Sequence, residues 1–359
     1  MKLLWLAHRD PLNPKAGGAE RSITEICTRL AAMGYDITLI TAGWENSKSI
    51  DTYKGFKIRR FQGVVMVHLF VPLYILRNKP DLVVNDLGHA IPWLSTAILR
   101  KRSLVFFRHL HARSLPGQVS KLFGKLITAI EKCYFIIYPN CKFITESTTS
   151  IEDIIKLGIK NENVIRITPG VNLEIYKLSQ KSELPKLVYF GGMRKYKRPI
   201  EVIHIFNELL KRFTELNLVV IGTGPELAQV EKLTEFYGIL DHVRFVGRVS
   251  DNILSDTISH CWVNLHTSVT EGWGLSILEA SAAGTPTVAY SVPGVVDVIE
   301  DEKNGIKVKE GDRNAFVDAV SKILMEPDRW WQSSRRVAEK YSWDDTARMW
   351  AEVINREIK

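Results

Sequence analysis

Cysteine and long apolar runs are both scarce in this chain of 359 residues. It has four cysteines, and none lies in a Cys-x-x-Cys pair or at the spacing of a zinc site. We therefore expect reduced thiols in a cytoplasmic protein. No stretch reaches the roughly 18 apolar residues of a membrane-spanning helix. The nearest approach, residues 63–76, is interrupted by His68 and Pro72, and we expect it to be buried or to lie on a membrane surface.

Several motifs of nucleotide-binding and metal-binding proteins are also absent. The sequence has no P-loop string and no Gly-x-Gly-x-x-Gly fingerprint, and the second absence counts against a Rossmann-type oxidoreductase. No two aspartates are separated by a single residue, so no Asp-x-Asp pair is present to hold a divalent cation. No cluster of cysteine and histidine offers a transition-metal site. We expect neither a metal nor another cofactor.

What the chain does contain is a regular alternation of short apolar strands and amphipathic helices. Strands are predicted at residues 2–8, 35–43, 57–62, 81–86, 103–109 and 142–147, and a second series begins at 186–192. This alternation predicts an α/β protein with doubly wound parallel sheets. The length fits two domains of roughly 150–200 residues each, and the polar run 179–185 is the candidate linker.

The most informative segment is residues 262–290. A buried strand is followed by a turn with Gly272 and Gly274, and then by a helix that ends near Gly284. The free N–H groups at the start of such a helix favour an anion. Glu271 would lie at the mouth of this site, and Glu279 about two turns along could hold the two hydroxyls of a ribose. The segment therefore predicts a sugar-nucleotide site.

The string EGWGLSILEASAAGTPTVA closely resembles the E-x7-E signature of retaining GT-B glycosyltransferases of the family-4 type. Trp273 replaces the usual phenylalanine and Thr287 a valine, and neither change touches a charged position. The resemblance implies that Glu271 contacts the donor sugar and that Glu279 holds the ribose. It also implies that the backbone amides of the turn hold the diphosphate. The turn residues concerned are Gly272, Trp273, Gly274, Leu275 and Ser276.

The same resemblance implies a GT-B fold, in which two Rossmann-like, doubly wound domains face a central cleft. Residues 1–178 would form the acceptor-binding domain and residues 179–343 the donor-binding domain. The C-terminal helix, at about 344–359, would pack back on the first domain. The missing Asp-x-Asp pair fits this architecture, because the other large glycosyltransferase architecture holds its metal on such a pair.

A basic loop at 189–199 supplies the cations that the diphosphate would need. It contains Gly191, Gly192, Arg194 and Lys197. The family usually has an arginine directly after the first glycine and a lysine five residues later. Lys197 fills the lysine position, whereas Gly192 occupies the arginine position, so Arg194 is the candidate replacement. A solvated basic turn without a role in the reaction is the alternative interpretation.

The N-terminal half contributes a second glycine loop and two histidines. Gly17 and Gly18 lie between the first strand and its helix, at the position of the loop that faces the donor diphosphate in the family. His109 and His111 follow the strand at 103–109, where the family commonly carries a histidine that contacts the transferred sugar. The spacing does not decide between them, and either could instead be a packing or surface residue.

Further candidates lie in the second half. Gly247 and Arg248 end the strand VRFVGRV, which resembles the family strand beside the nucleobase. His266 precedes Glu271 by about one turn and could adjoin the site, although most single histidines at strand ends are structural.

Charge is distributed unevenly along the chain. Residues 1–170 contain 24 Lys and Arg against 13 Asp and Glu, whereas residues 171–359 contain 24 against 27. Lys121, Lys125 and Lys132 alternate with apolar residues, as in an amphipathic helix on an anionic bilayer. An ordinary solvated helix face would give the same pattern. No nucleic-acid motif accompanies the positive charge, so we expect no nucleic-acid partner.

The sequence thus predicts a retaining, metal-independent glycosyltransferase. It would move a hexose from a nucleotide-diphosphate sugar to a hydroxyl of a glycan or lipid-linked acceptor, at the inner face of the cell membrane. The product would be a cell-surface polysaccharide or a glycolipid. Two alternatives stay open, namely a catalytically silent nucleotide-sugar-binding relative, to which Gly192 points, and a nucleotide-sugar oxidoreductase.

Overall fold

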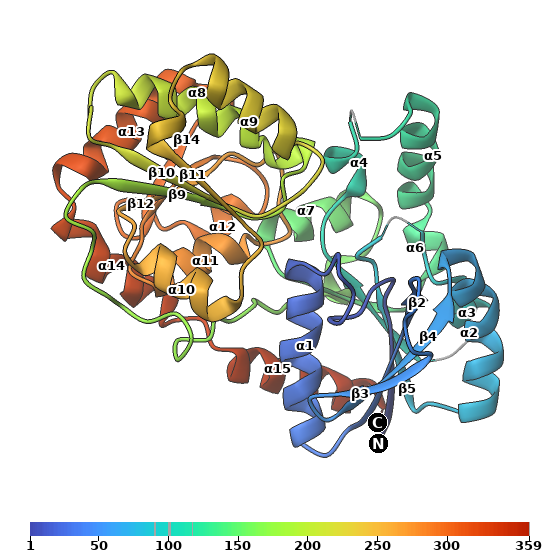
Figure 1. Ribbon diagram of the computed structural model, residues 1–359. Coiled ribbons are helices and arrows are strands. Elements are labelled where there is room, and N and C mark those ends of the chain that lie inside the picture. Colours follow the sequence, from blue (N-terminus) through green and yellow to red (C-terminus); the bar gives the residue numbers. More distant parts are fainter. Residues whose placement is uncertain (90, 100–101, 117, 359) are drawn as a thin grey trace. The chain divides into compact units, whose positions relative to one another are not determined.

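The chain folds into two compact units, shown in the computed structural model of Figure 1, which describes residues 1–89, 91–99, 102–116 and 118–358. The first unit comprises Met1–Ala112, Val119–Gly170 and Trp343–Lys359, and the second comprises Arg113–Gln118 and Val171–Ser342. The predicted boundary at residue 178 therefore lies inside the second unit. The reason is that Val171 and Tyr176 are buried in the core of that unit.

The first unit is built on one sheet. Its strands are β1 (Lys2–Leu6), β2 (Asp36–Gly43), β3 (Ile50–Tyr53), β4 (Phe56–Gln62), β5 (Leu82–Asp86), β6 (Ser103–Phe107), β7 (Lys142–Thr145) and β8 (Val164–Arg166). Their order is β3-β4-β2-β1-β5-β6-β7-β8, and every pair is parallel except β3 with β4. The short edge strand β3 was not predicted, because it lacks an apolar run.

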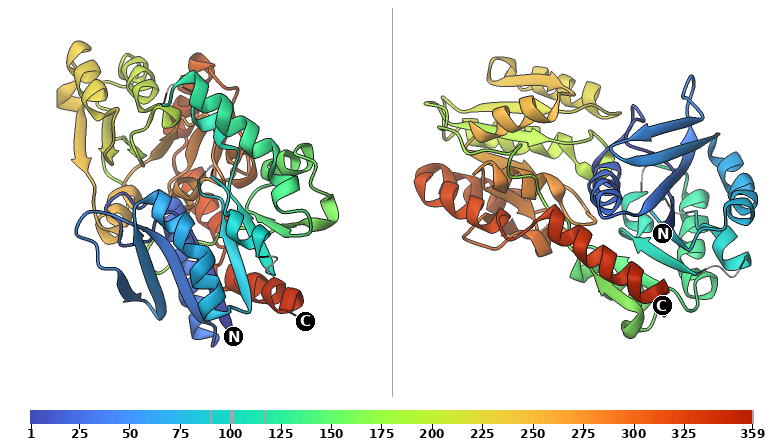
Figure 2. Two further views of the ribbon diagram at one scale, coloured as in Figure 1. Left: turned by 90° about the vertical axis from the view of Figure 1, so that its right-hand side faces the viewer. Right: turned by 90° about the horizontal axis from the view of Figure 1, so that it is seen from below.

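Helices cover both faces of this sheet (Figures 1 and 2). They are α1 (Gly18–Ala32), α2 (Val64–Asn78), α3 (Leu94–Ile98), α5 (Lys121–Lys132), α6 (Tyr134–Ile137), α7 (Thr148–Lys156), the 3₁₀ turn at Asn161–Asn163, and α15 (Trp343–Ile358). The short helix α4 (His111–Ser114) begins in the first unit and ends in the second. Successive side chains of a strand point to opposite faces. Leu4 accordingly packs with the core under α2, whereas Trp5 contacts Trp350 of α15 with ring centroids 4.9 Å apart. The C-terminal helix thus belongs to the first unit.

The second unit repeats the architecture with six parallel strands. These are β9 (Lys186–Phe190), β10 (Asn217–Ile221), β11 (Val243–Gly247), β12 (Val263–His266), β13 (Thr287–Tyr290) and β14 (Gly305–Val308), in the order β11-β10-β9-β12-β13-β14. Its helices are α8 (Pro199–Leu210), α9 (Leu227–Phe236), α10 (Asp251–Ser259), α11 (Leu275–Ala282), α12 (Val295–Val298), α13 (Arg313–Met325) and α14 (Asp328–Ala338), with 3₁₀ turns at Lys195–Lys197 and Leu240–His242. The prediction of two doubly wound parallel sheets is confirmed.

The apolar segment 63–76 forms most of α2. Val67, Val71 and Ile75 are buried against the sheet, while the opposite side of the helix is exposed. The segment is therefore a surface helix rather than a buried one. No helix in the described part of the chain has both the length and the apolar character needed to cross a membrane.

Candidate functional site

The two signature glutamates lie on either side of the turn that joins β12 to α11. Gly274 ends this turn with a φ of +104°, and a Cβ there would lie 3.1 Å from Ile277 Cδ1. A larger residue would be strained in this conformation, so glycine is required where the helix begins. Glu279 lies one helical turn beyond Leu275 on the same side of α11, and its side chain is buried.

Glu271 is held from one side only. Its Oε1 accepts a hydrogen bond of 2.7 Å from Ser268 Oγ, lies 3.1 Å from His266 Nε2, and forms an ion pair with Lys197 Nζ. Within the described ranges, Oε2 makes no hydrogen bond. One carboxylate oxygen is therefore anchored, and the other is left to accept a hydrogen bond from a ligand hydroxyl.

The ion pair between Glu271 and Lys197 keeps both groups charged. Burial alone would raise the pKa of Glu271, but the positive charge of Lys197 and the contact with His266 hold that pKa well below its usual range. Burial would likewise lower the pKa of Lys197, and the negative charge of Glu271 outweighs it, so the pKa of Lys197 is raised. At neutral pH the pair consists of a carboxylate and an ammonium group.

The start of α11 has the unpaired donors of an anion site. Among the described residues, the backbone N–H groups of Gly274, Leu275 and Ser276 donate no backbone hydrogen bond, whereas the N–H of Ile277 donates to Gly274 O at 2.9 Å. Unpaired N–H groups and the helix dipole together favour negative charge in front of the helix. The turn that carries Glu271 therefore also offers a place for a phosphate.

The other predicted loops of the second unit meet at the same edge of its sheet. Gly222 N donates to Gly247 O at 2.8 Å, and Gly191 N donates to Ile221 O at 3.0 Å. A Cβ at Gly222 would lie 1.9 Å from Gly191 O, so only glycine allows these two loops to touch. The loops after β9, β10 and β11 thus form one continuous surface, to which Gly192 also belongs.

The cations of the loop after β9 differ in whether they contact Glu271. Lys197 reaches Glu271, whereas Arg194 is exposed and forms no ion pair in the part of the chain that is described. Arg198 instead pairs with Glu310 at 2.8 Å. The structure therefore brings Lys197, but not Arg194, to the signature glutamate. Arg248 after β11 is exposed as well.

In the first unit, charged residues at three neighbouring strand ends form a buried network. Arg108 Nη2 lies 2.9 Å from Asp86 Oδ2, and Arg108 Nη1 lies 3.1 Å from Glu146 Oε1. Arg108 also donates to Ala19 O at 3.3 Å, in the first turn of α1. This network holds the start of α1 against the carboxyl ends of the strands, where open α/β sheets bind their ligands.

Two family descriptions match almost the whole chain between them. "Glycosyl transferases group 1" matches residues 173–342, and "Glycosyltransferase Family 4" matches residues 16–175. The chain belongs to the family-4 type of GT-B glycosyltransferases.

Relatives of this glycosyltransferase cover nearly its full length. It is 28% identical to D-inositol 3-phosphate glycosyltransferase 2 of Catenulispora acidiphila, over 99% of this chain and 95% of that protein. Its fold resembles sucrose-phosphate synthase from Thermosynechococcus elongatus with a TM-score of 0.84, at 19% identity, over 99% and 98% of the two chains. It also resembles the Anabaena protein HepE in complex with UDP-glucose, with a TM-score of 0.80 at 16% identity, over 99% and 100% of the chains.

The two candidate histidines of the glycosyltransferase differ in their surroundings. His111 begins α4, where its backbone N–H donates to Glu131 Oε1 at 2.6 Å and its Nδ1 lies 3.3 Å from the same oxygen. His109 lies between β6 and α4, with its ring centroid 5.1 Å from that of His111. Glu131 thus fixes the orientation of His111, a contact that the sequence did not reveal.

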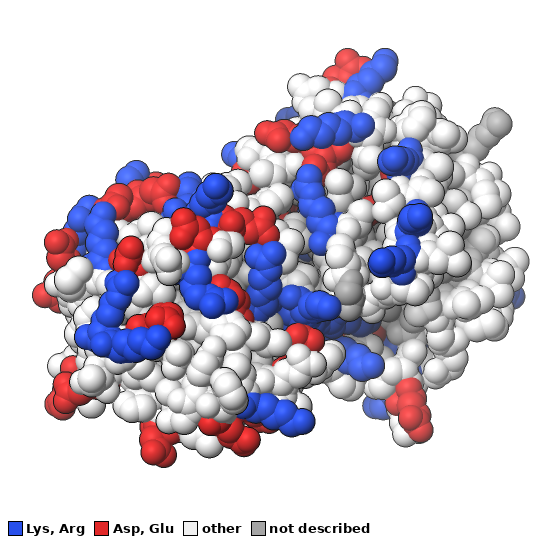
Figure 3. Space-filling view, turned by 90° about the horizontal axis from the view of Figure 1, so that it is seen from above, with Lys and Arg blue, Asp and Glu red and all other residues white. Residues whose placement is uncertain are grey.

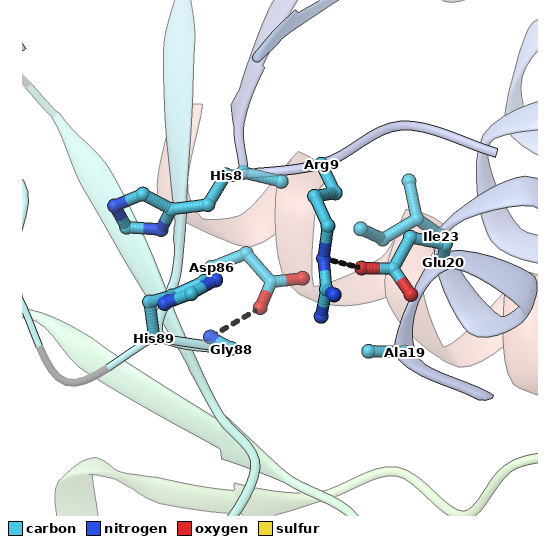
Figure 4. Close-up of a pocket in the computed structure, with 9 residues that line it drawn as sticks. His8, Arg9, Ala19, Glu20, Ile23, Asp86, Gly88 and His89 are labelled. Atoms are coloured by element: carbon cyan, nitrogen blue, oxygen red, sulfur yellow. Dashed lines mark hydrogen bonds and ion pairs between the residues drawn. The ribbon is translucent and has the colours of Figure 1, made fainter. Parts of the chain in front are cut away.

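A small pocket opens beside the N-terminal glycine loop (Figure 4). Its lining includes His8, Arg9, Glu20, Asp86 and His89. Arg9 Nε lies 3.0 Å from Glu20 Oε1, and Glu20 Oε2 accepts a hydrogen bond of 2.7 Å from the N–H of the adjacent Gly17. Glu20 therefore closes the first turn of α1. Gly17 and Gly18 themselves are exposed.

His8 of this pocket belongs to an aromatic group that the sequence did not reveal. His8 Nε2 lies 3.1 Å from His68 Nε2 of α2, and both imidazoles stack on Trp93, with ring centroids 4.7 and 4.4 Å from it. His8 Nδ1 is buried and has no hydrogen-bond partner among the described residues. The residues come from three distant segments, so only the fold brings them together.

Because the imidazole of His8 is buried, we expect the folding stability of the chain to depend on pH. Burial, followed by the positive fields of His89, His68, His111 and Arg9, lowers the pKa of His8 well below its ordinary 6.5. The unfolded chain therefore binds more protons than the folded chain below about pH 6.5, and stability falls as the pH drops through this range until His8 is protonated in the folded state too.

The thermal unfolding midpoint, recorded between about pH 8 and pH 5, measures this loss. His8→Gln should make the midpoint less dependent on pH, whereas His260→Gln, at a histidine of the second unit whose side chain is 40% exposed, should not. Equal pH dependence in the wild type and in His8→Gln would contradict the assignment.

Sequence reasoning missed three other residues at strand ends, one in the second unit and two in the first. Ser268 and Arg108 were not singled out, and Asp86 was included only as the end of a strand. Each follows or ends a buried strand, and that position was the available signal, because strand ends of a parallel sheet converge on one edge. No group of three or more His, Cys, Asp or Glu side chains among the described residues is arranged to hold a metal ion.

Proposed function

We propose that this glycosyltransferase transfers a hexose from a nucleotide-diphosphate sugar to an acceptor hydroxyl, with retention of configuration and without a metal ion. The observation that carries the proposal is the ion pair of Lys197 with Glu271 beside the free amides of α11. This turn offers a cation and N–H donors for the diphosphate and a carboxylate for the sugar. Glu279 would hold the ribose.

The reaction that suits these groups is a front-face displacement. The bond between the anomeric carbon and the diphosphate oxygen breaks, and the acceptor oxygen bonds to that carbon from the same face. The acceptor proton passes to the departing phosphate oxygen. A double displacement would need a carboxylate nucleophile on the opposite face of the sugar, and Glu271 would instead orient the donor sugar through Oε2.

Lys197 and the amides of Gly274, Leu275 and Ser276 would stabilise the negative charge that grows on the leaving diphosphate. Such groups accelerate the reaction only if they bind the departing charge better than the intact donor. The diphosphate would compete with Glu271 for Lys197, and Arg194, an exposed residue of the same loop as Lys197, would add a second cation. The contributions of Gly17, Gly18, His109 and His111 to donor binding stay predictions.

For the acceptor we infer a cell-surface glycan or a lipid-linked glycan, made at the cytoplasmic face of a membrane by a peripheral enzyme. The excess of Lys and Arg over Asp and Glu in residues 1–170 supports this assignment, because it favours a negatively charged surface as partner.

Binding of nucleoside diphosphates tests the donor half of the proposal. UDP, GDP, ADP, dTDP and NAD are each added without metal and then with Mg²⁺, and thermal unfolding is followed. A diphosphate present at 100 times its dissociation constant should add about 2.7 kcal/mol of stability. UDP is the first to test, because a structural relative is described with UDP-glucose.

A shift with one diphosphate and no need for Mg²⁺ would support the proposal and identify the donor base. A shift with NAD alone would favour the oxidoreductase. No shift with any of these compounds would contradict the proposed donor site. Donor binding without any turnover on a range of acceptors would favour the silent relative instead.

A further inference from the structure

The outer side of α2 is apolar although it faces solvent. Val65, Leu69, Leu73 and Leu76 follow one another down one side of the helix and are exposed, with exposed fractions of 71% for Val65 and 63% for Leu69. The opposite side is buried against the sheet. A surface helix of a soluble protein normally turns a polar face outward, and α2 carries no charged side chain before Arg77.

The neighbouring helices extend this surface. In the left view of Figure 2, α2, α3, α5 and α6 lie on the side of the first unit that faces the viewer. We call their exposed apolar side chains the apolar face. Its members are Val64, Val65, Met66, Leu69, Phe70, Leu73, Leu76, Leu94, Ile98, Leu122, Phe123, Leu126, Phe135 and Ile136. Exposed apolar patches of this extent mark interaction surfaces.

Exposed cations lie on α2 and α5, the helices that carry most of the apolar face. Arg77 and Lys79 lie at the end of α2, and Lys121, Lys125 and Lys132 lie on α5, all of them exposed. None of these five cations forms an ion pair in the described part of the chain. The one acidic residue of α5, Glu131, is buried and bound to His111. In Figure 3 the right-hand part of the molecule, where α5 lies in Figure 1, is mostly uncharged, with separate basic side chains and a few acidic ones toward its edges.

This combination selects one kind of partner. An apolar face edged by Lys and Arg fits the interface of an anionic bilayer, where apolar side chains enter the acyl boundary and cations meet lipid phosphates. A second copy of the chain fits less well, because a two-fold interface would bring the two sets of unpaired cations together.

The apolar face is linked to the pocket of the first unit through α2. His68 lies on α2, and its Nε2 is 3.1 Å from His8 Nε2 at the pocket lined by Arg9, Asp86 and His89. The helix that carries the exposed apolar side chains therefore also contributes a residue beside this pocket.

From these observations we propose that the apolar face docks on an anionic bilayer, with α2 and α5 lying in the plane of the interface, and that the acceptor is the head group of a membrane lipid. This inference rests on the proposed transfer reaction for the identity of the acceptor, whereas the docking itself is independent of that reaction.

Vesicle flotation tests the docking. The full chain is mixed with vesicles of phosphatidylcholine alone, or of phosphatidylcholine with an equal amount of phosphatidylglycerol. The protein should float with the anionic vesicles and remain below with the neutral ones. Leu69→Glu/Leu73→Glu should abolish flotation. Each lysine removed in Lys121→Gln/Lys125→Gln should weaken partitioning about five-fold at low salt.

The matched control is Phe236→Glu, because Phe236 is an apolar residue of the second unit that is 81% exposed. It should float like the wild type. Unchanged thermal unfolding of all variants would show that a loss of flotation is not a loss of fold. The UDP and GDP shifts should be the same in Leu69→Glu/Leu73→Glu as in the wild type, which separates a failure of docking from a failure of the proposed function.

Three results would overturn the proposal. The first is no flotation of the wild type with anionic vesicles. The second is equal flotation of the wild type and Leu69→Glu/Leu73→Glu. The third is a dimer in solution that the double variant makes monomeric while vesicles bind neither, since the apolar face would then be an interface between copies.

Discussion

Replacing Glu271 by Gln should lower kcat about 100- to 1,000-fold, the usual cost of removing one group that acts on the transition state. The amide has nearly the shape of the carboxylate and can still accept from Ser268, so the fold should be unchanged. What is lost is the negative charge that pairs with Lys197 and the second oxygen that we assign to the donor sugar. Steady-state kinetics with the donor identified by thermal unfolding measures the effect.

The affinity for the nucleoside diphosphate supplies an internal check on this prediction. Glu271 and the diphosphate would compete for Lys197, so binding of the free diphosphate to Glu271→Gln should be as tight as in the wild type or tighter. Glu235→Gln changes an exposed glutamate of α9 in the same unit and should leave kcat unchanged. A wild-type kcat in Glu271→Gln would mean that the carboxylate has no part in the reaction.

The fold was largely predictable because its signals are local. Most parallel strands of the two sheets contain a short apolar run, and glycine or polar residues mark many of the connections. The two short strands β3 and β8 were not predicted, and β3 shows why. β3 pairs antiparallel to β4 at the sheet edge and has alternating polar residues, so its apolar signal was too weak to detect.

The turn around Glu271 could be predicted from a single stretch of sequence for the same reason. Gly274, Leu275 and Glu279 are fixed relative to one another by one turn and one helix. Lys197, 74 positions away from Glu271 in the sequence, was identified through the family resemblance. That it forms an ion pair with Glu271 follows only from the adjacency of β9 and β12 in the sheet.

The groups of the first unit were harder to predict because they are assembled from many segments. Arg108, Asp86 and Glu146 lie at the ends of three different strands, and His8, His68 and Trp93 come from three further positions along the chain. Each residue alone has an ordinary structural interpretation. Only strand order and helix packing show that their side chains meet.

The exposed side of α2 shows a further limit of sequence patterns. Periodicity distinguishes a helix with one apolar side from a strand, but α2 is apolar on both sides. Such a segment is normally assigned to the core. That one side faces solvent becomes evident only when the sheet beneath it is known, and this is why the sequence left a buried and a membrane-surface position as alternatives.

Lys197→Met is expected to damage both catalysis and stability, and the two effects can be separated. The ammonium group is the cation that pairs with Glu271 and that we assign to the leaving diphosphate. Its removal should lower kcat about 100- to 1,000-fold and weaken binding of the free diphosphate. That loss of affinity distinguishes it from Glu271→Gln, which should bind the diphosphate at least as well as the wild type.

The stability effect of Lys197→Met follows from the charge that remains. Both side chains are largely buried, with exposed fractions of 19% for Lys197 and 12% for Glu271. Removing one partner of a buried pair typically costs about 3–5 kcal/mol, although protonation of Glu271 would relieve part of that cost. Stability of Lys197→Met should therefore recover as the pH falls, because the unpaired carboxylate then takes up a proton more readily in the folded chain than in the unfolded chain.

A double-mutant cycle distinguishes two causes of lost stability in Lys197→Met. One is the unpaired charge left on Glu271, and the other is the loss of the lysine side chain. Lys197→Met/Glu271→Gln contains no unpaired charge and should be more stable than Lys197→Met alone, so the two substitutions should be strongly non-additive. Lys195→Met, an exposed lysine of the same loop, is the matched control and should change neither kcat nor the unfolding midpoint. Additive losses in the cycle would show that the two residues do not interact, and the proposed diphosphate site would then lose its central cation.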